Sequence, residues 1–225
     1  MNFKALIAEF VGTFTLVFIG VGAIAADYTT GGAVGLTGVA LAHGLAIAVM
    51  ISAVVAISGG HLNPAVTIGL LSAGKIDLRS ALGYVISQCL AAIVAIAVIK
   101  LCVPADVLWD IQYGVPAVSD APEITTIMAL VTEIVLTFFL VFVVYGTAVD
   151  RRAPKMGGLF IGLAVAMGIM MGGPISGAAM NPARHLGPAL LGGGMQNTWI
   201  YWAGPIIGAI LAAQVYKNIL EGKPA

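Results

Sequence analysis

Residues 57–69 read ISGGHLNPAVTIG, and residues 175–187 read ISGAAMNPARHLG. Each copy contains an Asn-Pro-Ala triplet followed by a short apolar run. Asn is a preferred N-cap residue and Pro suits the first helical position, so each triplet predicts the start of a helix. The predicted helices, 63–73 and 181–192, are shorter than the ~20 residues that a helix needs to cross a bilayer. The sequence therefore predicts two short helices in equivalent places of a duplicated chain.

The composition indicates that the chain lies in a lipid bilayer. It has 225 residues, of which 60% are hydrophobic and 9% charged, with a mean hydropathy of +1.05. Soluble domains carry about 25% charged residues. The net charge is zero, which argues against a nucleic-acid partner. No polar block interrupts the chain, so we expect a single membrane domain covering residues 1–225.

Six segments approach the length of a spanning helix. They are residues 3–26, 35–58, 80–102, 124–148, 157–173 and 197–219. The first is too long for a signal-peptide core and is predicted to be a span. The two short helices fall after the second and fifth spans. Backbone that stops partway through a membrane must be buried in protein or line a water-filled cavity, so we expect re-entrant helices at a transport site.

The two halves of the chain also repeat. Residues 6–18, LIAEFVGTFTLVF, resemble residues 130–142, LVTEIVLTFFLVF, and this aligns Glu9 with Glu133. Each half holds three spans, and because three is odd the second half enters from the other side of the membrane. We predict inverted repeats of about 1–102 and 124–225, joined by an extracellular loop at 103–123. The two short helices should then meet near the midplane.

The distribution of charge predicts the orientation, because Lys and Arg accumulate on the cytoplasmic side. The basic residues of the termini and of two connections are Lys4, Lys75, Arg79, Arg151, Arg152, Lys155, Lys217 and Lys223. The opposite loops carry Asp27, Asp106, Asp110, Asp120 and Glu123. Both termini should therefore be cytoplasmic. Short tails without targeting signals favour a plasma membrane.

The triplets also predict a chemical property. A helix N-terminus carries about half a positive charge and unsatisfied N–H groups, so two of them facing one point repel cations. The amides of Asn63 and Asn181 can donate to a passing water oxygen and orient that water. The sequence therefore predicts a barrier to protons where Pro64, Ala65, Pro182 and Ala183 begin the two helices.

The paired triplets, the flanking SGGHLNPAVT and SGAAMNPAR, and the glutamates in AEF and TEI resemble the aquaporin, or major intrinsic protein, family over nearly the whole chain. The resemblance implies an all-α membrane protein with six transmembrane helices in a right-handed bundle and two re-entrant half-helices. It implies a passive channel for water that excludes protons and ions, with one pore per subunit and usually a homotetramer. No cofactor or metal is implied.

The same resemblance places a four-residue selectivity filter at His43, Ile169, Ala178 and Arg184. A charged Arg184 is costly in a membrane unless it faces protein or water, and it would repel cations and donate to the solute. Ala178 would contribute its carbonyl. This set resembles the plant tonoplast intrinsic branch, some members of which also pass ammonia. Ammonia is an additional candidate solute, but the loop histidine of ammonia-permeable members has no counterpart in 101–123, which weakens this inference.

Other functions remain as alternatives. Glycerol facilitators of the family usually have Asp after the filter arginine and a basic residue four positions later, where this chain has His185 and Ala189. Glycerol or another small polyol is therefore a lesser option, as is a structural protein with a closed pore. A secondary transporter would need a charged coupling site. An intramembrane enzyme is disfavoured, because no nucleophile and base or metal-ligand cluster stands at usable spacing.

Three further residues are candidates for a role near the pore. Glu9 and Glu133 are intramembrane carboxylates, which can form proton relays. The resemblance implies instead that they accept hydrogen bonds from the backbone of the re-entrant loops. His61 stands two residues before Asn63 and either lines the cytoplasmic vestibule or stabilises the loop.

Overall fold

Six long apolar helices form the protein, as the sequence predicts. The computed structural model describes residues 2–152 and 156–222, and in these ranges all regular structure is helical. Lys155 and Lys223, two of the residues that predict the orientation, lie outside the described ranges. The helices long and apolar enough to cross a membrane are α1 (Phe3–Thr29), α2 (Gly35–Ser58), α4 (Leu78–Ile99), α6 (Thr126–Val144), α7 (Gly157–Ser176) and α9 (Ile200–Val215), where the spans of α6 and α9 include the helical turns that follow them to Val149 and Leu220.

Several helix ends differ from the predicted spans. Helix α4 begins at Leu78 rather than 80, because the Asp77 side chain caps it by accepting from the Ser80 N–H at 3.0 Å. Helix α7 continues to Ser176, three residues past the predicted end, and stops where Gly177 adopts a left-handed φ of 74°. Helices α6 and α9 each continue into one turn of π-helix, Tyr145–Val149 and Tyr216–Leu220.

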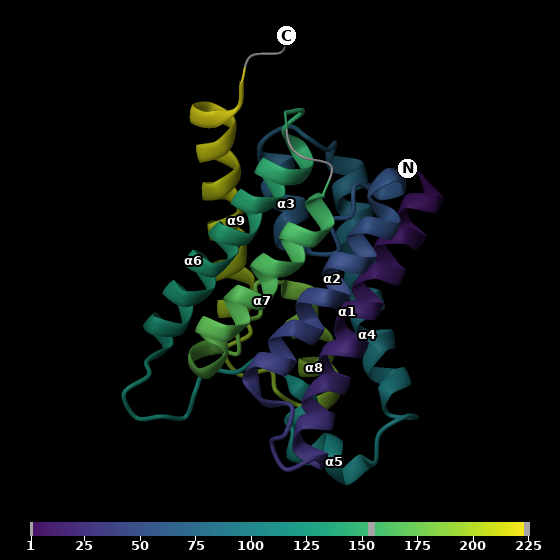
Figure 1. Ribbon diagram of the computed structural model, residues 1–225, viewed down its shortest axis with the longest axis vertical. Coiled ribbons are helices and arrows are strands. Elements are labelled where there is room, and N and C mark those ends of the chain that lie inside the picture. The colour runs from purple at the N-terminus through teal and green to yellow at the C-terminus, as the bar shows by residue number, and fades with distance from the viewer. Residues whose placement is uncertain (1, 153–155, 223–225) are drawn as a thin grey trace.

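Two half-helices stand in the predicted places, α3 (Pro64–Ser72) and α8 (Pro182–Gly192). At about 1.5 Å per residue they are roughly 14 and 17 Å long, about half of a ~30 Å hydrocarbon core. In Figure 1 the start of α1 and the last turns of α9 lie at one end of the bundle, which we call the terminal end. Helix α3 lies toward this end, and α8 lies toward the other end, where α5 (Ala105–Asp110) is also found.

The two halves of the chain interlock through the half-helices. Helix α3 packs against α9 of the second half, and α8 packs against α4 of the first half. A Cβ added to Gly69 would lie 2.9 Å from the Ala209 carbonyl oxygen, and one added to Gly187 would lie 2.5 Å from the Ala92 carbonyl oxygen. Gly69 and Gly187 occupy equivalent positions of the repeat. Glycine is therefore required at both crossings, because the backbones meet there without space for a side chain.

The distribution of polar side chains is that of a protein in lipid. Large apolar side chains are exposed on the outer faces of the spans, for example Leu82 at 57% and Ile86 at 61%. Glu9, Gln88 and Glu133 are completely buried. Polar groups inside a membrane are costly unless they face the interior of a bundle, and these three do so.

The connection between the halves is more ordered than a simple loop. Residues 103–123 contain α5 and a 3₁₀ turn, Gln112–Gly114. The Tyr28 hydroxyl donates to Asp110 at 2.5 Å, and the Ser119 N–H donates to the Ile175 carbonyl at 3.0 Å. These contacts attach the connection to the ends of α1 and α7.

Ion pairs hold the terminal end together. Arg152 donates to Asp150 with its Nη2 at 2.5 Å and its Nε at 3.0 Å, and it also donates to the Leu220 carbonyl at 2.8 Å. Lys75 pairs with Glu221 at 2.5 Å. Hydrogen bonds from Arg152 hold the pKa of Asp150 below its ordinary value of 3.8.

Candidate pore

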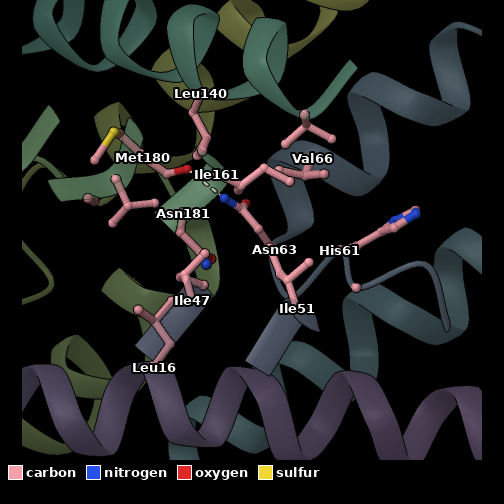
Figure 2. Close-up of a pocket in the computed structure, with 14 residues that line it drawn as sticks. Leu16, Ile47, Ile51, His61, Asn63, Val66, Leu140, Ile161, Met180 and Asn181 are labelled. Carbon is pink, nitrogen blue, oxygen red and sulfur yellow. Dashed lines mark hydrogen bonds between the residues drawn. The ribbon is translucent and has the colours of Figure 1, made fainter. Parts of the chain in front are cut away.

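The two triplets meet in the middle of the bundle. Asn63 donates from Nδ2 to the Met180 carbonyl at 2.7 Å, and Asn181 donates from Nδ2 to the Leu62 carbonyl at 3.0 Å. Figure 2 shows both asparagines beside the central pocket, with the first of these bonds as a dashed line. The contacts join residues 117 and 119 positions apart in the chain. Each asparagine is therefore held by the loop of the other half.

The side-chain oxygens of Asn63 and Asn181 already accept hydrogen bonds, whereas each side-chain nitrogen keeps one free N–H for a solute. The Oδ1 of Asn63 accepts from the Ala65 N–H at 2.8 Å, and the Oδ1 of Asn181 accepts from the Ala183 N–H at 3.0 Å. Each oxygen is thus occupied in capping its own half-helix. Each Nδ2 carries two protons, of which one is used in the crosswise bond. One N–H of each asparagine remains, so a water at this point meets donors and must accept.

Glu9 fixes the loop that precedes α3. Its Oε1 accepts from the Ser58 hydroxyl at 2.7 Å and the His61 N–H at 2.9 Å. Its Oε2 accepts from the Leu62 N–H at 2.6 Å and from Gln88 at 2.8 Å. Four donors meet one carboxylate. Leu62 is the residue whose carbonyl accepts from Asn181, so Glu9 positions the asparagine of the other half.

Glu133 repeats this arrangement in the second half. Its Oε1 accepts from the Ser176 hydroxyl at 2.7 Å and the Ala179 N–H at 2.8 Å, and its Oε2 accepts from the Met180 N–H at 2.8 Å. The Met180 carbonyl in turn accepts from Asn63. The repeat is thus preserved at the level of single hydrogen bonds, except that, within residues 2–152 and 156–222, Glu133 has no counterpart of the bond from Gln88.

A narrow apolar cavity surrounds the asparagines. The space open to water centres is about 20 Å³, enough for about one water by the usual requirement of at least ~10–15 Å³. Figure 2 shows aliphatic side chains around it. Its lining includes Leu16, Ile47, Ile51, Leu140, Ile161 and Val165. The cavity thus combines aliphatic walls with the two asparagines and with the loops that precede α3 and α8.

A wider cavity of about 570 Å³ opens toward the terminal end, and His61 contributes to its lining. His61 Nδ1 lies 3.1 Å from the Thr67 hydroxyl. Thr67 donates its own proton to the Asn63 carbonyl at 3.0 Å, so Nδ1 must be the donor to Thr67. In Figure 2 the His61 ring points away from the asparagines. The residue thus combines both roles considered for it, lining the wide cavity and bonding to the first turn of α3.

His43 and Arg184 are brought into direct contact at the other end of the pore. Arg184 Nη2 lies 3.2 Å from His43 Nε2, and His43 Nδ1 lies 2.8 Å from the Val39 carbonyl. A guanidinium only donates and a carbonyl only accepts, so Nε2 is the acceptor and Nδ1 carries the proton. His43 is therefore a neutral imidazole with both nitrogens occupied.

The free donors at this end belong to Arg184. Its Nε and Nη1 are buried and have no hydrogen-bond partner in the described part of the chain. A buried donor without a partner is costly, so these two groups are candidates to donate to a solute in the pore. The remaining two filter candidates, Ile169 and Ala178, are buried in one apolar cluster with Leu136. Ala178 has a positive φ of 44°, which turns the loop just before Asn181.

Sequence reasoning missed several residues that hold the pore. Ser58 and Ser176 bond to the two glutamates, and Tyr84 and Tyr201 donate to the carbonyls of Ser58 and Ser176 at 2.8 and 2.9 Å. The ISG that both copies share was the signal for the serines. His185 is buried, stacks on Tyr201 at 4.1 Å between centroids, and lies 3.2 Å from the Pro116 carbonyl. No local signal indicates that contact. Across 2–152 and 156–222, no group of three or more His, Cys, Asp or Glu residues could hold a metal ion.

Six spans, two half-helices that meet at paired asparagines, and a narrow path between them define a membrane channel. The sequence pattern of the family described as Major intrinsic protein matches residues 1–216. Aquaporin TIP4-4 of Zea mays is 46% identical, covering 96% of this chain and 86% of its own. Probable aquaporin TIP3-2 of Arabidopsis thaliana is 41% identical, covering 97% and 84%. The X-ray structure of the aquaglyceroporin from Plasmodium falciparum superposes with a TM-score of 0.84 at 28% identity, covering 98% and 97%.

The chain therefore belongs to the major intrinsic protein, or aquaporin, family. It is a multi-pass membrane protein and a water channel, and it is not an enzyme. The predicted fold, with six spans and two half-helices in inverted repeats, is confirmed.

Proposed function

We propose that this water channel selects its solutes at two places, the asparagine pair and a filter of His43, Ile169, Ala178 and Arg184. The proposal is supported by the polar groups that remain free at these two places, all of which are hydrogen-bond donors. They are one N–H on the Nδ2 of each asparagine and the Nε and Nη1 groups of Arg184. A water oxygen can accept from each in turn. A cation meets a guanidinium first and then two helix N-termini, all of which repel it.

Proton exclusion follows from the same hydrogen bonds. A proton moves along a file of waters only where each water both donates to one neighbour and accepts from the next. Between Asn63 and Asn181 a water accepts from both sides, so its two protons point outward along the pore in opposite directions. The apolar walls of Leu16, Ile47 and Ile51 offer no alternative acceptor.

Ammonia is the small neutral solute that we propose besides water. The nitrogen lone pair of ammonia can accept a hydrogen bond from Arg184. Ile169 adds an apolar wall to the proposed filter, at a position where strict water channels of the family commonly have a histidine. Glycerol is the second candidate, because a structure similar in fold is titled an aquaglyceroporin. A closed-pore structural protein is the third, and the water-sized space at the asparagines argues against it.

Glu9 and Glu133 act in this proposal as supports of the re-entrant loops, and His61 as part of the vestibule at the terminal end. Each carboxylate accepts from a serine hydroxyl and from two backbone N–H groups of the re-entrant loop in its own half, which supports a structural role over a proton relay.

We also propose one channel domain over residues 1–225, with repeats of about 1–102 and 124–225 and the connection 103–123 on the extracellular side. Lys75 pairs with Glu221 and Arg152 donates to the Leu220 carbonyl, so both basic residues lie at the terminal end, which supports cytoplasmic termini. Family membership supports a homotetramer. The plasma membrane has no support from the relatives, whose names place them among the TIP-type aquaporins.

The test is stopped-flow light scattering on proteoliposomes that contain the purified protein, with water, ammonia and glycerol measured in one preparation. Fast water flux with a low activation energy, together with ammonia flux, is the expected result. Glycerol flux without ammonia flux would favour the second candidate. Flux equal to that of empty liposomes from a correctly assembled protein would contradict an open pore.

A further inference from the structure

Gly20 on α1 stands directly behind the ring of His43. A Cβ added to Gly20 would lie 2.7 Å from Cδ2 and 2.8 Å from Cε1 of that ring, and closer still to Nε2. Real Cβ atoms essentially never come within 3.0 Å of such neighbours. Gly20 also follows Leu16 by one helical turn, and Leu16 lines the central cavity. Gly20 therefore lies on the pore-facing side of α1.

The ring cannot retreat from such a methyl group along its own helix. His43 Nδ1 is bound to the Val39 carbonyl at 2.8 Å, and the residue is only 2% exposed. The atom nearest to the added Cβ is Nε2, the same atom that accepts from Arg184 at 3.2 Å. Any side chain at residue 20 would thus act first on the contact between His43 and Arg184.

The inverted repeat indicates that this space belongs to the half of the pore that holds His43 and Arg184. When the alignment of 6–18 with 130–142 is continued by two residues, Gly20 corresponds to Val144. His43 precedes GLAIAVM as Ile161 precedes GLAVAMG, so His43 corresponds to Ile161. Val144 and Ile161 both line the central cavity. One half of the pore thus combines a glycine with an imidazole, and the other half combines two aliphatic side chains.

We propose that Gly20 is a positioning residue of the filter: it leaves the space in which the His43 ring lies back against α1 in contact with Arg184, and thereby keeps the filter open. The inference rests on the filter proposed above. The inference attributes the shape of the filter at His43 to two residues together, His43 and the glycine at position 20.

The test compares four variants, Gly20→Ala, Gly22→Ala, His43→Ala and the Gly20→Ala/His43→Ala double variant, with the wild type in proteoliposomes at equal amounts of assembled protein. We expect Gly20→Ala to lower osmotic water permeability roughly tenfold, equivalent to about 1.4 kcal/mol of added barrier. Gly22→Ala is the matched control, because a Cβ there meets nothing within 4 Å, and it should behave as the wild type. Gly20→Ala combined with His43→Ala should recover the flux of His43→Ala alone, because the colliding ring is gone.

Wild-type permeability in Gly20→Ala would overturn the inference, and so would a double variant that stays as slow as Gly20→Ala. If Gly20→Ala fails to assemble, assembly of the double variant supports the contact with His43, and failure of both overturns it. A separate outcome tests the proposed filter itself. Water and ammonia fluxes in His43→Ala that equal those of the wild type would contradict the filter. A mere packing role for Gly20 would not be relieved by removing one ring at position 43.

Discussion

The bonds to the two buried glutamates predict unequal costs for the same substitution. A glutamine replaces one carboxylate oxygen by an NH₂ group, which cannot accept. In Glu133→Gln the NH₂ can be placed toward the single donor on Oε2, the Met180 N–H, so that the bonds from Ser176 and Ala179 survive. One buried N–H is then left without an acceptor, at a cost of about 1–3 kcal/mol.

Glu9→Gln has no such favourable orientation. Both of its oxygens accept from two donors, so either placement deprives one backbone N–H, of His61 or Leu62, and also disturbs Ser58 or Gln88. We expect a cost of roughly 2–6 kcal/mol, from two bonds at about 1–3 kcal/mol each. For a chain of this length 1 kcal/mol shifts Tm by about 2–4 °C, which gives roughly 2–12 °C for Glu133→Gln and a larger shift for Glu9→Gln.

The assay is thermal unfolding of the detergent-purified protein at one fixed heating rate, followed by tryptophan fluorescence. Glu123→Gln is the matched control, because Glu123 is exposed in the connection between the halves. Water flux should fall in both buried variants, since Leu62 and Met180 carry the carbonyls that hold Asn181 and Asn63. Equal Tm values for both variants and the control would refute the reasoning, as would a larger loss in Glu133→Gln than in Glu9→Gln.

Other perturbations test the filter and the terminal end. Arg184→Val should raise proton leak, measured with a pH dye in proteoliposomes, by at least about tenfold, because a charge about 4 Å from a passing cation contributes roughly 4 kcal/mol at an effective dielectric near 20; an unchanged leak would place the barrier elsewhere. His43→Phe should reduce ammonia or methylamine flux while water flux persists, and unchanged ammonia and methylamine fluxes would remove His43 from the filter. Asp150→Asn should lower Tm slightly at neutral pH, because it removes the charge of the ion pair with Arg152 and one of the two oxygens that accept from the guanidinium. Since the folded pKa of Asp150 is depressed, this difference should be complete above pH 3.8 and disappear as the pH falls through the folded value; a difference that grows on acidification would contradict the assignment.

The sequence predicted the architecture well because its signals are local or repetitive. Six apolar segments, two Asn-Pro-Ala triplets and the matching of Glu9 with Glu133 are visible without knowing which helices touch. The predicted ends were less accurate. The cap by Asp77 and the left-handed Gly177 moved the ends of α4 and α7, because helix ends depend on single hydrogen bonds and single backbone angles rather than on average hydropathy.

The sequence alone therefore determined that this chain lies in a membrane and that it is duplicated. It also determined that each half contains a short helix, starting at Asn-Pro-Ala, that cannot span the bilayer. Only the tertiary structure decided which donors remain for a solute. Asn63 and Asn181 bond crosswise to loops of the opposite halves, and His43 accepts from Arg184 on a distant helix. The His43 ring also fills the space beside Gly20 on another helix. Apolar length and helix capping act between neighbours in sequence, whereas the satisfaction of a buried polar group depends on which distant segment packing brings within 3 Å of it.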